Sequence, residues 1–467
     1  MTVGTSADAA IDPEGLLERA EAAVARALKR GAAGAEAFVA SGTFVGADVE
    51  RDRVTYTTGG SDSGMGLRVV RDGRLGFAFS SDPTRVDEAV DRALALSRLA
   101  TPRGFTFAPG GRPYPDVHGL HDPRLASIEP PEVVAMAGEL VDAAKAVDAE
   151  AVVVGGGVGV GWGASAIANS EGVSVHNAGT SMQSAAYVVL RSGGTSTGFE
   201  SLASRLRDVD ATAVGRAAAQ MAKDAQGPVA LGTGGEMDVV LRPVAAAELL
   251  EYTVVPSLIG DAAQRGESAF TGKAGEAVAG ADVSLSDDPT LHGGLNSGRS
   301  DDEGVPSRRN AIIGSGVLRG FLYDAFSAHE YGVEGTGSAV RGAGGGGGWK
   351  SQPEAFVSNL VLDVPSRGTL DDLVAQVDRG LLVHDVLGAH TANASTLDFS
   401  VNSTMPFEIR KGEVVGVREP VMLAGNVGAL LRAVLGGGGE PRQCGGSMSA
   451  SCIIVPWVAA GGVVVTP

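Results

Sequence analysis

Cysteine and long apolar runs are scarce in this chain of 467 residues, and each shortage excludes a class of protein. Two cysteines, Cys444 and Cys452, are too few for a disulfide framework, so a reducing cytoplasm is the expected location. No apolar run approaches the length of about 18 residues that predicts a membrane-spanning helix. The N-terminus shows no basic and apolar leader pattern, and we expect a soluble protein that is not exported.

Positive charge is also in short supply. The chain has 37 Lys and Arg against 55 Asp and Glu, which gives a formal net charge of −18. Nucleic acids and anionic membranes bind patches of Lys and Arg, and the sequence shows no such patch. We therefore expect neither nucleic acid nor a membrane as a partner.

Glycine, in contrast, is abundant, with 69 residues scattered among strand-like runs. We expect these glycines to mark turns, bulges and pliable loops. The only low-complexity segment is Gly342 to Gly348, which lacks the Gly-Lys-Ser/Thr ending of a phosphate-binding loop. It is predicted to be a flexible tether or a lid.

The first half of the chain alternates amphipathic helical patterns with strand-like runs. Helices are predicted over 13–30, 83–99, 130–146 and 211–225. Strands are predicted over 37–40, 44–50, 66–70, 75–79, 151–160, 165–169, 173–176 and 184–191. Asp72-Gly73 between apolar runs predicts a hairpin.

A cluster of Gly and Pro near residue 228 marks the clearest boundary, and the length allows two or three domains. We expect an α+β protein: an N-terminal α/β domain over 1–227, with a mixed or antiparallel sheet and flanking helices, and a β-rich C-terminal domain over 228–467. A sub-boundary is placed near 101–128, which is rich in Pro and Gly. In the second half, strands are predicted over 237–241, 283–285, 311–323, 358–364, 381–386 and 452–457, with helices from Pro243 and over 369–379.

Histidine limits the metal chemistry that this chain can support. The seven histidines are His118, His121, His176, His292, His329, His384 and His390. A His-Glu-x-x-His zinc signature needs two imidazoles on one helix face. The one His-Glu pair, His329-Glu330, has no second histidine within reach, and Gly332 and Gly335 indicate a loop or strand end there.

Other candidate ligands also lack a supporting pattern. His118 and His121 lie in a loop rich in Pro and Gly without a third ligand nearby. The runs Asp287-Asp288 and Asp301-Asp302-Glu303 have no EF-hand spacing and are more typical of turns. Cys444 and Cys452 lack a Cys-x-x-Cys spacing, and no Gly-x-Ser-x-Gly elbow marks a serine nucleophile.

Several segments in order resemble the TldD/PmbA family, also called the TldD/TldE or "modulator of DNA gyrase" family. They are AEAFVASG and GMGLRVVRDGRLGFAFSSD near the start, AIANSEGVSV in the middle, and GLLVHDVLGAHTANASTLDFSVN and IRKGEVVGVREPVMLAGN toward the end. Residues 266–288 and 300–324 continue the likeness. The resemblance covers nearly the whole chain and implies the family's two-domain α+β fold.

The resemblance also implies where a metal site would be. The family's TldD kind of subunit carries His-Glu-x-x-x-His followed by Gly-Asp and a later Cys, which bind zinc, with the Glu as base. Anchoring on Gly260-Asp261 places Glu251 and Pro256 at the two His positions and Tyr252 at the Glu position. Proline has no ligand atom and tyrosine is a poor base near neutral pH. Pro256 should also break or kink the helix that begins near Pro243.

This pattern is similar to the family's TldE kind, which lacks the ligands and pairs with a TldD-like subunit. The resemblance thus implies a non-catalytic subunit of a heterodimeric peptidase for unfolded peptides or peptide-like amides, with no cofactor here and zinc in the partner. Glu251, Tyr252, His329 and Cys444 are the candidate residues facing the substrate chamber or the partner. Whether Cys444 or Cys452 matches the family position stays open.

Two alternatives remain from the sequence. The first is a self-sufficient, homodimeric hydrolase of a small natural-product amide, with ligands taken from His292, His329, His384 or His390. The second is a peptide-binding or chaperone-like protein without peptidase activity.

Overall fold

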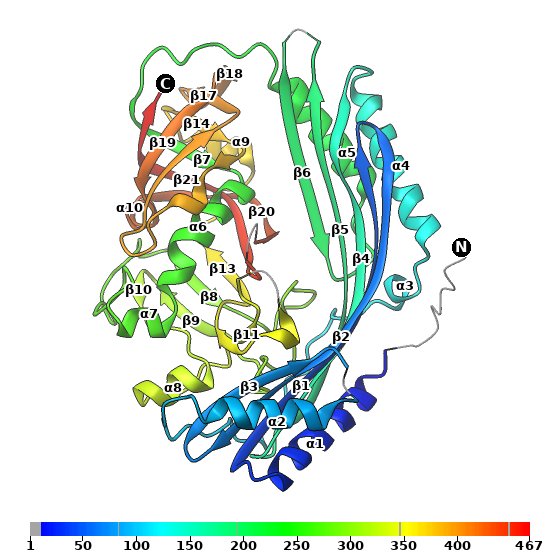
Figure 1. Cartoon of the computed structure of the whole chain (residues 1–467). Helices are drawn as coiled ribbons and strands as arrows, with labels where there is room; N and C mark the ends of the chain where they lie inside the picture. The colour runs from blue at the N-terminus through cyan, green and yellow to red at the C-terminus, as the bar shows by residue number, and fades with distance from the viewer. Residues whose placement is uncertain (1–10, 83, 193, 345–346, 447–448) are drawn as a thin grey trace.

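A computed structural model describes residues 11–82, 84–192, 194–344, 347–446 and 449–467. Figure 1 shows two bodies side by side: a long curved sheet from the first half of the chain, and a second body of strands and short helices from the second half. None of the helices that the structure describes is long and apolar enough to cross a membrane. The fold is α+β, as the sequence predicts.

The N-terminal body is a six-stranded sheet in the order β3-β2-β1-β4-β5-β6, in which every neighbouring pair is antiparallel. Its strands are β1 (Gly34–Glu50), β2 (Arg53–Arg71), β3 (Arg74–Ser80), β4 (Val152–Asn169), β5 (Ser174–Leu190) and β6 (Ser196–Ser204). Its helices are α1 (Pro13–Lys29), α2 (Val86–Ser97), α3 (Pro123–Ala126), α4 (Pro130–Val147) and α5 (Ala211–Asp224).

One face of this sheet is covered by helices, because side chains alternate between the two faces of a strand. The odd-numbered residues 35–39 of β1 pack with α1 and α2, while residues 45–49 pack with α4 and α5. Figure 1 shows these two helix pairs along the outer side of the sheet. The even-numbered residues of β1 therefore face the C-terminal body.

The C-terminal body is built on a thirteen-stranded mixed sheet within the described residues. Its strands are β7 (Gly235–Leu241), β8 (Ser284–Asp287), β9 (Asn310–Gly314), β10 (Val317–Leu318), β13 (Asn359–Asp363), β14 (Arg379–Val383), β15 (Val386–Leu387), β16 (Asp398–Ser403), β17 (Pro406–Arg410), β18 (Glu413–Val417), β19 (Val421–Asn426), β20 (Val434–Gly445) and β21 (Cys452–Thr466). A separate hairpin joins β11 (Ala339–Arg341) and β12 (Pro353–Ala355).

Short helices connect these strands: α6 (Pro243–Ser257), α7 (Gly260–Gln264), α8 (Ala325–Tyr331), α9 (Leu370–Val374), α10 (Val427–Arg432), η1 (Gly348–Lys350) and η2 (Ala389–Thr391). Helix α6 is apolar on nearly all sides and is buried in the main core with β21. A helix without a polar face needs such surroundings.

Several sequence-based boundaries are wrong. β1, β4 and β5 are single long strands where the sequence predicts two runs each, and β6 with the first half of β2 was not predicted. The glycines of β4 do not mark a turn: Gly157, Gly159, Gly161 and Gly163 alternate along one face of the strand. The predicted helix 369–379 ends at Val374, and residues 379–383 form β14.

Candidate functional site

Glu251 and Tyr252 lie on α6, at the positions that the resemblance assigns to a metal ligand and a base. Glu251 is buried, and its Oε1 accepts a hydrogen bond of 2.7 Å from Ser449 Oγ. The Tyr252 ring meets the ring of His390 edge to face, with 6.3 Å between centroids. Both side chains are thus held by partners within the C-terminal body.

Pro256 does not break α6, which corrects the sequence-based expectation. The helix continues to Ser257, and the Leu258 N–H still donates to the carbonyls of Val254 and Val255. Pro256 lies in the last turn, where the missing N–H affects only the end of the hydrogen-bond ladder. Positions 251 and 252 therefore remain in helical geometry. They differ from the family's metal ligand and base in the chemistry of their side chains and not in backbone conformation.

Acidic groups gather around the same part of α6. Burial, and then the charges of Asp385 and Glu251, raise the pKa of Glu248 to about 7. Burial also raises the pKa of Asp385. Burial and neighbouring negative charge thus both favour the neutral form of Glu248.

The two cysteines lie on neighbouring strands near the C-terminus. Cys444 pairs with Ile453 and Cys452 pairs with Gly445 in the β20–β21 ladder. Both thiols are free and buried, and burial raises the pKa of Cys444 to about 11 and that of Cys452 to about 12. Neutral thiols at pH 7 are poor metal ligands and poor nucleophiles.

The histidines considered for a self-sufficient hydrolase lie apart. His384 is packed between Phe407 and Trp457, and burial lowers its pKa to about 4. His329 lies on α8, against Phe105, with its Nε2 3.2 Å from the Arg103 carbonyl. The loop or strand end that the sequence predicts around His329 is therefore wrong, because this residue lies in a helix. Over the part of the chain that the structure describes, no group of three or more His, Cys, Asp and Glu is placed to hold a metal ion.

The acidic run 301–303 has structural partners, in agreement with the turn interpretation. Asp301 Oδ1 accepts the amides of Glu303 and Val305, and its Oδ2 accepts the amide of Ala339. Asp287 likewise accepts the amide and hydroxyl of Ser358. Asp301 thus shapes the turn at 301–305, while Asp287 at the end of β8 holds the residue that precedes β13.

A buried ionic network connects the two bodies. Glu36 and Arg68 are paired across β1 and β2, Arg68 also donates to Glu303, and Arg341 of β11 donates to Glu36. The distances are 2.6 to 2.9 Å, and the side chains of all four are at most 2% exposed. The C-terminal loop that carries Glu303 is therefore anchored to the uncovered face of the N-terminal sheet.

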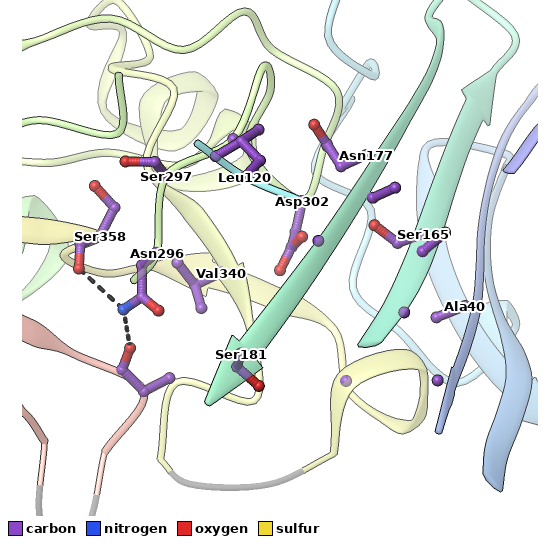
Figure 2. Close-up of a pocket in the computed structure, with 18 of the residues that line it drawn as sticks. Ala40, Leu120, Ser165, Asn177, Ser181, Asn296, Ser297, Asp302, Val340 and Ser358 are labelled. Carbon is purple, nitrogen blue, oxygen red and sulfur yellow. Dashed lines mark hydrogen bonds between the residues drawn. The ribbon is translucent and has the colours of Figure 1, made fainter. Parts of the chain in front are cut away.

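Two cavities lie between the bodies. The first, of about 730 Å³, lies between β1, β4 and β5 on one side and residues 295–302 and Val340 on the other. Figure 2 shows Ala40, Ser165 and Asn177 of the strands across the cavity from Asn296 and Asp302 of the loops. Asn296 Nδ2 donates to the carbonyls of Ser358 and Ala450, which fixes this wall.

The second cavity, of about 830 Å³, continues along the same face of the sheet toward β20. Phe44, Gly161 and Ser181 line both cavities, so the two adjoin. Cys444 lines the second cavity, whereas Glu251, Tyr252 and His329 line neither. Both volumes suit an organic ligand, since such pockets typically measure about 300–1,000 Å³.

The floor of the first cavity is a row of glycines, which was not predicted from the sequence. Gly179 of β5 pairs with Gly163 of β4, and Gly163 pairs with Gly42 of β1. Gly42 in turn pairs with Asp62 of β2. Arg205 covers the β5 end, because a Cβ at Gly179 would lie 2.1 Å from its Nη1. Trp349 covers the β2 end, where its Nε1 donates to Asp62 at 3.1 Å. Glycine at every second position from 157 to 163 is the sequence pattern that could have predicted this row.

Comparison with known proteins identifies the family. Sequence models of the PmbA/TldA metallopeptidase match in three parts: domain 1 over residues 35–97, the central domain over 123–226 and the C-terminal domain over 234–466. The chain belongs to the PmbA/TldD family. The family expected from the sequence is thereby confirmed.

Similar proteins span most of the chain. TldE from Thermococcus kodakarensis superposes with a TM-score of 0.87 at 27% identity, over 96% of this chain and 100% of that one. A metalloprotease of Methanothermobacter thermautotrophicus is 28% identical over 86% of this chain and 87% of its own. Metalloprotease PmbA of Escherichia coli O157:H7 is 23% identical over 88% and 90%.

The family's metal does not fit the residues at the corresponding place in this PmbA/TldD member. Pro256 offers no ligand atom, and Glu251 already accepts a hydrogen bond from Ser449. The buried thiols and the separated histidines do not complete a set among the described residues. No chemical step through a metal follows from this chain's own side chains.

Proposed function

We propose that this chain is the non-catalytic, TldE-like subunit of a heterodimeric metallopeptidase that acts on unfolded peptides or peptide-like amides. The partner in this proposal is a TldD-like subunit that carries His-Glu-x-x-x-His and the zinc. The single observation that carries the proposal is the occupancy of the motif positions on α6 by Glu251, Tyr252 and Pro256.

The surroundings of α6 support this assignment. A zinc-binding helix needs imidazoles with a free path to the ion, and a carboxylate that can take a proton from water. Here Glu251 is bound to Ser449, Tyr252 packs with His390, and no thiolate is available at neutral pH. Similarity to a protein named TldE at 27% identity points the same way.

The contribution of this subunit is a wall for extended peptides. Its adjoining cavities lie along a sheet face whose glycines let a peptide backbone approach closely. A glycine surface contacts the peptide backbone without selecting particular side chains, which suits a peptidase for unstructured substrates.

Reconstitution tests this proposal. The chain is co-expressed with a candidate partner that carries His-Glu-x-x-x-His, and the mass of the purified species is measured by light scattering. We expect a complex with both chains that cleaves an unfolded protein, and an inactive chain when it is purified alone. Cleavage by this chain alone, or failure to associate with any such partner from its own genome, contradicts the proposal.

A further inference from the structure

Arg205 carries a positive charge at the wall of the first cavity without a carboxylate partner among the described residues. Its Nε donates to the carbonyls of Gly294 and Leu295, its Nη1 to that of Leu120, and its Nη2 to that of Ser297, over 3.0 to 3.5 Å. All of these acceptors are neutral backbone groups. The guanidinium is therefore positioned by hydrogen bonds, while its charge is not neutralised.

Arg68, which is buried, differs from the partly buried Arg205 in this respect. Burial disfavours the charged form of Arg68, but Glu36 and Glu303 outweigh it and raise its pKa. Burial lowers the pKa of Arg205 to about 10, and no Asp or Glu opposes the effect. Arg205 is partly buried, and withdrawing an unpaired charge from water is costly, so an anion in the cavity would stabilise it.

The guanidinium has hydrogen-bonding capacity left for that anion. Each terminal nitrogen bears a pair of N–H groups. The contacts above use one on Nη1 and one on Nη2, which leaves a further N–H on each. A carboxylate is the anion whose two oxygens match such a pair.

The acidic residues that share the cavity are engaged elsewhere. Asp301 accepts three backbone amides, and Asp302 Oδ2 accepts the amide of Arg341. Burial raises the pKa of both aspartates. Asp62 is at the opposite end of the glycine row and is bound to Trp349. Arg205 therefore dominates the electrostatic potential at the Gly179 end of the first cavity.

We propose that the first cavity binds the C-terminal carboxylate of a short extended peptide, with Arg205 as its counter-ion and the row Gly179, Gly163 and Gly42 as its floor. The inference rests on the peptide substrate of the proposed function and specifies which end of the peptide is recognised. From β5 to β2 the row crosses three strand spacings of about 4.8 Å, or about 14 Å, and because Arg205 and Trp349 cover its ends it fits at most about four extended residues. Trp349 closes the far end of this length.

Titration calorimetry on the purified full chain, without partner or metal, tests the inference. The probes are N-acetyl-tetra-alanine with a free carboxylate and the same peptide with a C-terminal amide. We expect the free acid to bind about tenfold more tightly or better, since charge-assisted hydrogen bonds are about twice as strong as neutral ones. In Arg205→Gln the two peptides should bind equally. Arg207→Gln, which removes a partly exposed neighbour paired with Glu132, should keep the preference.

A second variant separates ligand binding from the structural role of Arg205 between the bodies. Gly42→Val leaves Arg205 intact and fits the strand, because the nearest atom to an added Cβ is 3.5 Å away. It fills the floor and should abolish binding of both peptides. Equal affinity of the wild-type chain for acid and amide, no binding of either peptide, or an unchanged preference in Arg205→Gln overturns the inference. The calorimetry uses this chain alone and does not measure association with a partner. Failure of the peptide-binding inference can therefore be told apart from failure of the reconstitution test.

Discussion

Glu36 and Arg68 form a buried, two-contact ion pair across β1 and β2. Arg68 Nε donates to Glu36 Oε1 at 2.9 Å, and Arg68 Nη2 donates to Oε2 at 2.6 Å. The same Nη2 reaches Glu303 at 2.7 Å, and Glu303 in turn accepts the amide of Ala325 at the start of α8. One side chain of the sheet therefore holds a loop and a helix of the C-terminal body.

Replacing Arg68 by Met should strongly destabilise the fold. Glu36 and Glu303 would stay buried with one cationic partner fewer, and breaking a buried pair in this way costs about 3–5 kcal/mol. Urea unfolding followed by circular dichroism measures the change in the free energy of unfolding.

The control for this prediction is Arg308→Met, which removes a solvent-exposed pair with Glu334. Exposed pairs contribute little, so its effect should be far smaller. Equal effects of the two substitutions would show that the buried network does not stabilise the junction between the bodies.

His384 should make the stability depend on pH. Burial holds its folded-state pKa at about 4, below the ordinary value of 6.5. The unfolded chain therefore binds the additional proton first, and stability should fall as pH decreases from 6.5 to 4, by about 1.4 kcal/mol per unit. His384→Phe keeps a ring between Phe407 and Trp457 and removes the titration.

The measurement compares unfolding free energies of wild type and His384→Phe at several pH values. Taking the difference removes the contributions of groups with the opposite sign, such as Glu248, whose raised pKa lowers stability as pH increases. A difference that stays constant between pH 6.5 and 4 contradicts the account of a buried neutral imidazole.

Gly64 should be required for the docking of Trp349 on β2. A Cβ at Gly64 would lie 2.4 Å from the indole, so Gly64→Ala should displace Trp349 and cost about 1–3 kcal/mol. Increased acrylamide quenching of tryptophan fluorescence reports the displacement. Gly42→Ala is the matched control, because its added methyl group has room. Unchanged quenching in Gly64→Ala would mean that Trp349 does not close the cavity.

The sequence was sufficient for the fold class and for α1, α4, α5 and the start of α6, because these helices carry clear apolar periodicity or an N-terminal proline. It misplaced the long strands for a physical reason. One face of β4 is glycine from 157 to 163, because a cavity lies above it. Glycine has a low strand propensity, so the predicted strands stop at 160 and resume at 165 although the alternation continues through Gly161 and Gly163.

The candidate site was predicted in part. Positions 251, 252 and 256 could be found through the resemblance, but the sequence could not show that α6 passes through Pro256 or that Ser449 bonds Glu251. Arg205 carried no local signal, since its partners come from Leu120 and residues 294–297. The tether predicted for Gly342 to Gly348 includes Gly345 and Gly346, which lie outside the described residues.

The most direct test of the central claim is the zinc content of the purified chain, alone and in complex with a TldD-like partner. Elemental analysis should find no stoichiometric zinc in this chain alone and one zinc per heterodimer, with peptidase activity only in the complex. Stoichiometric zinc together with peptide cleavage in the isolated chain would contradict the account.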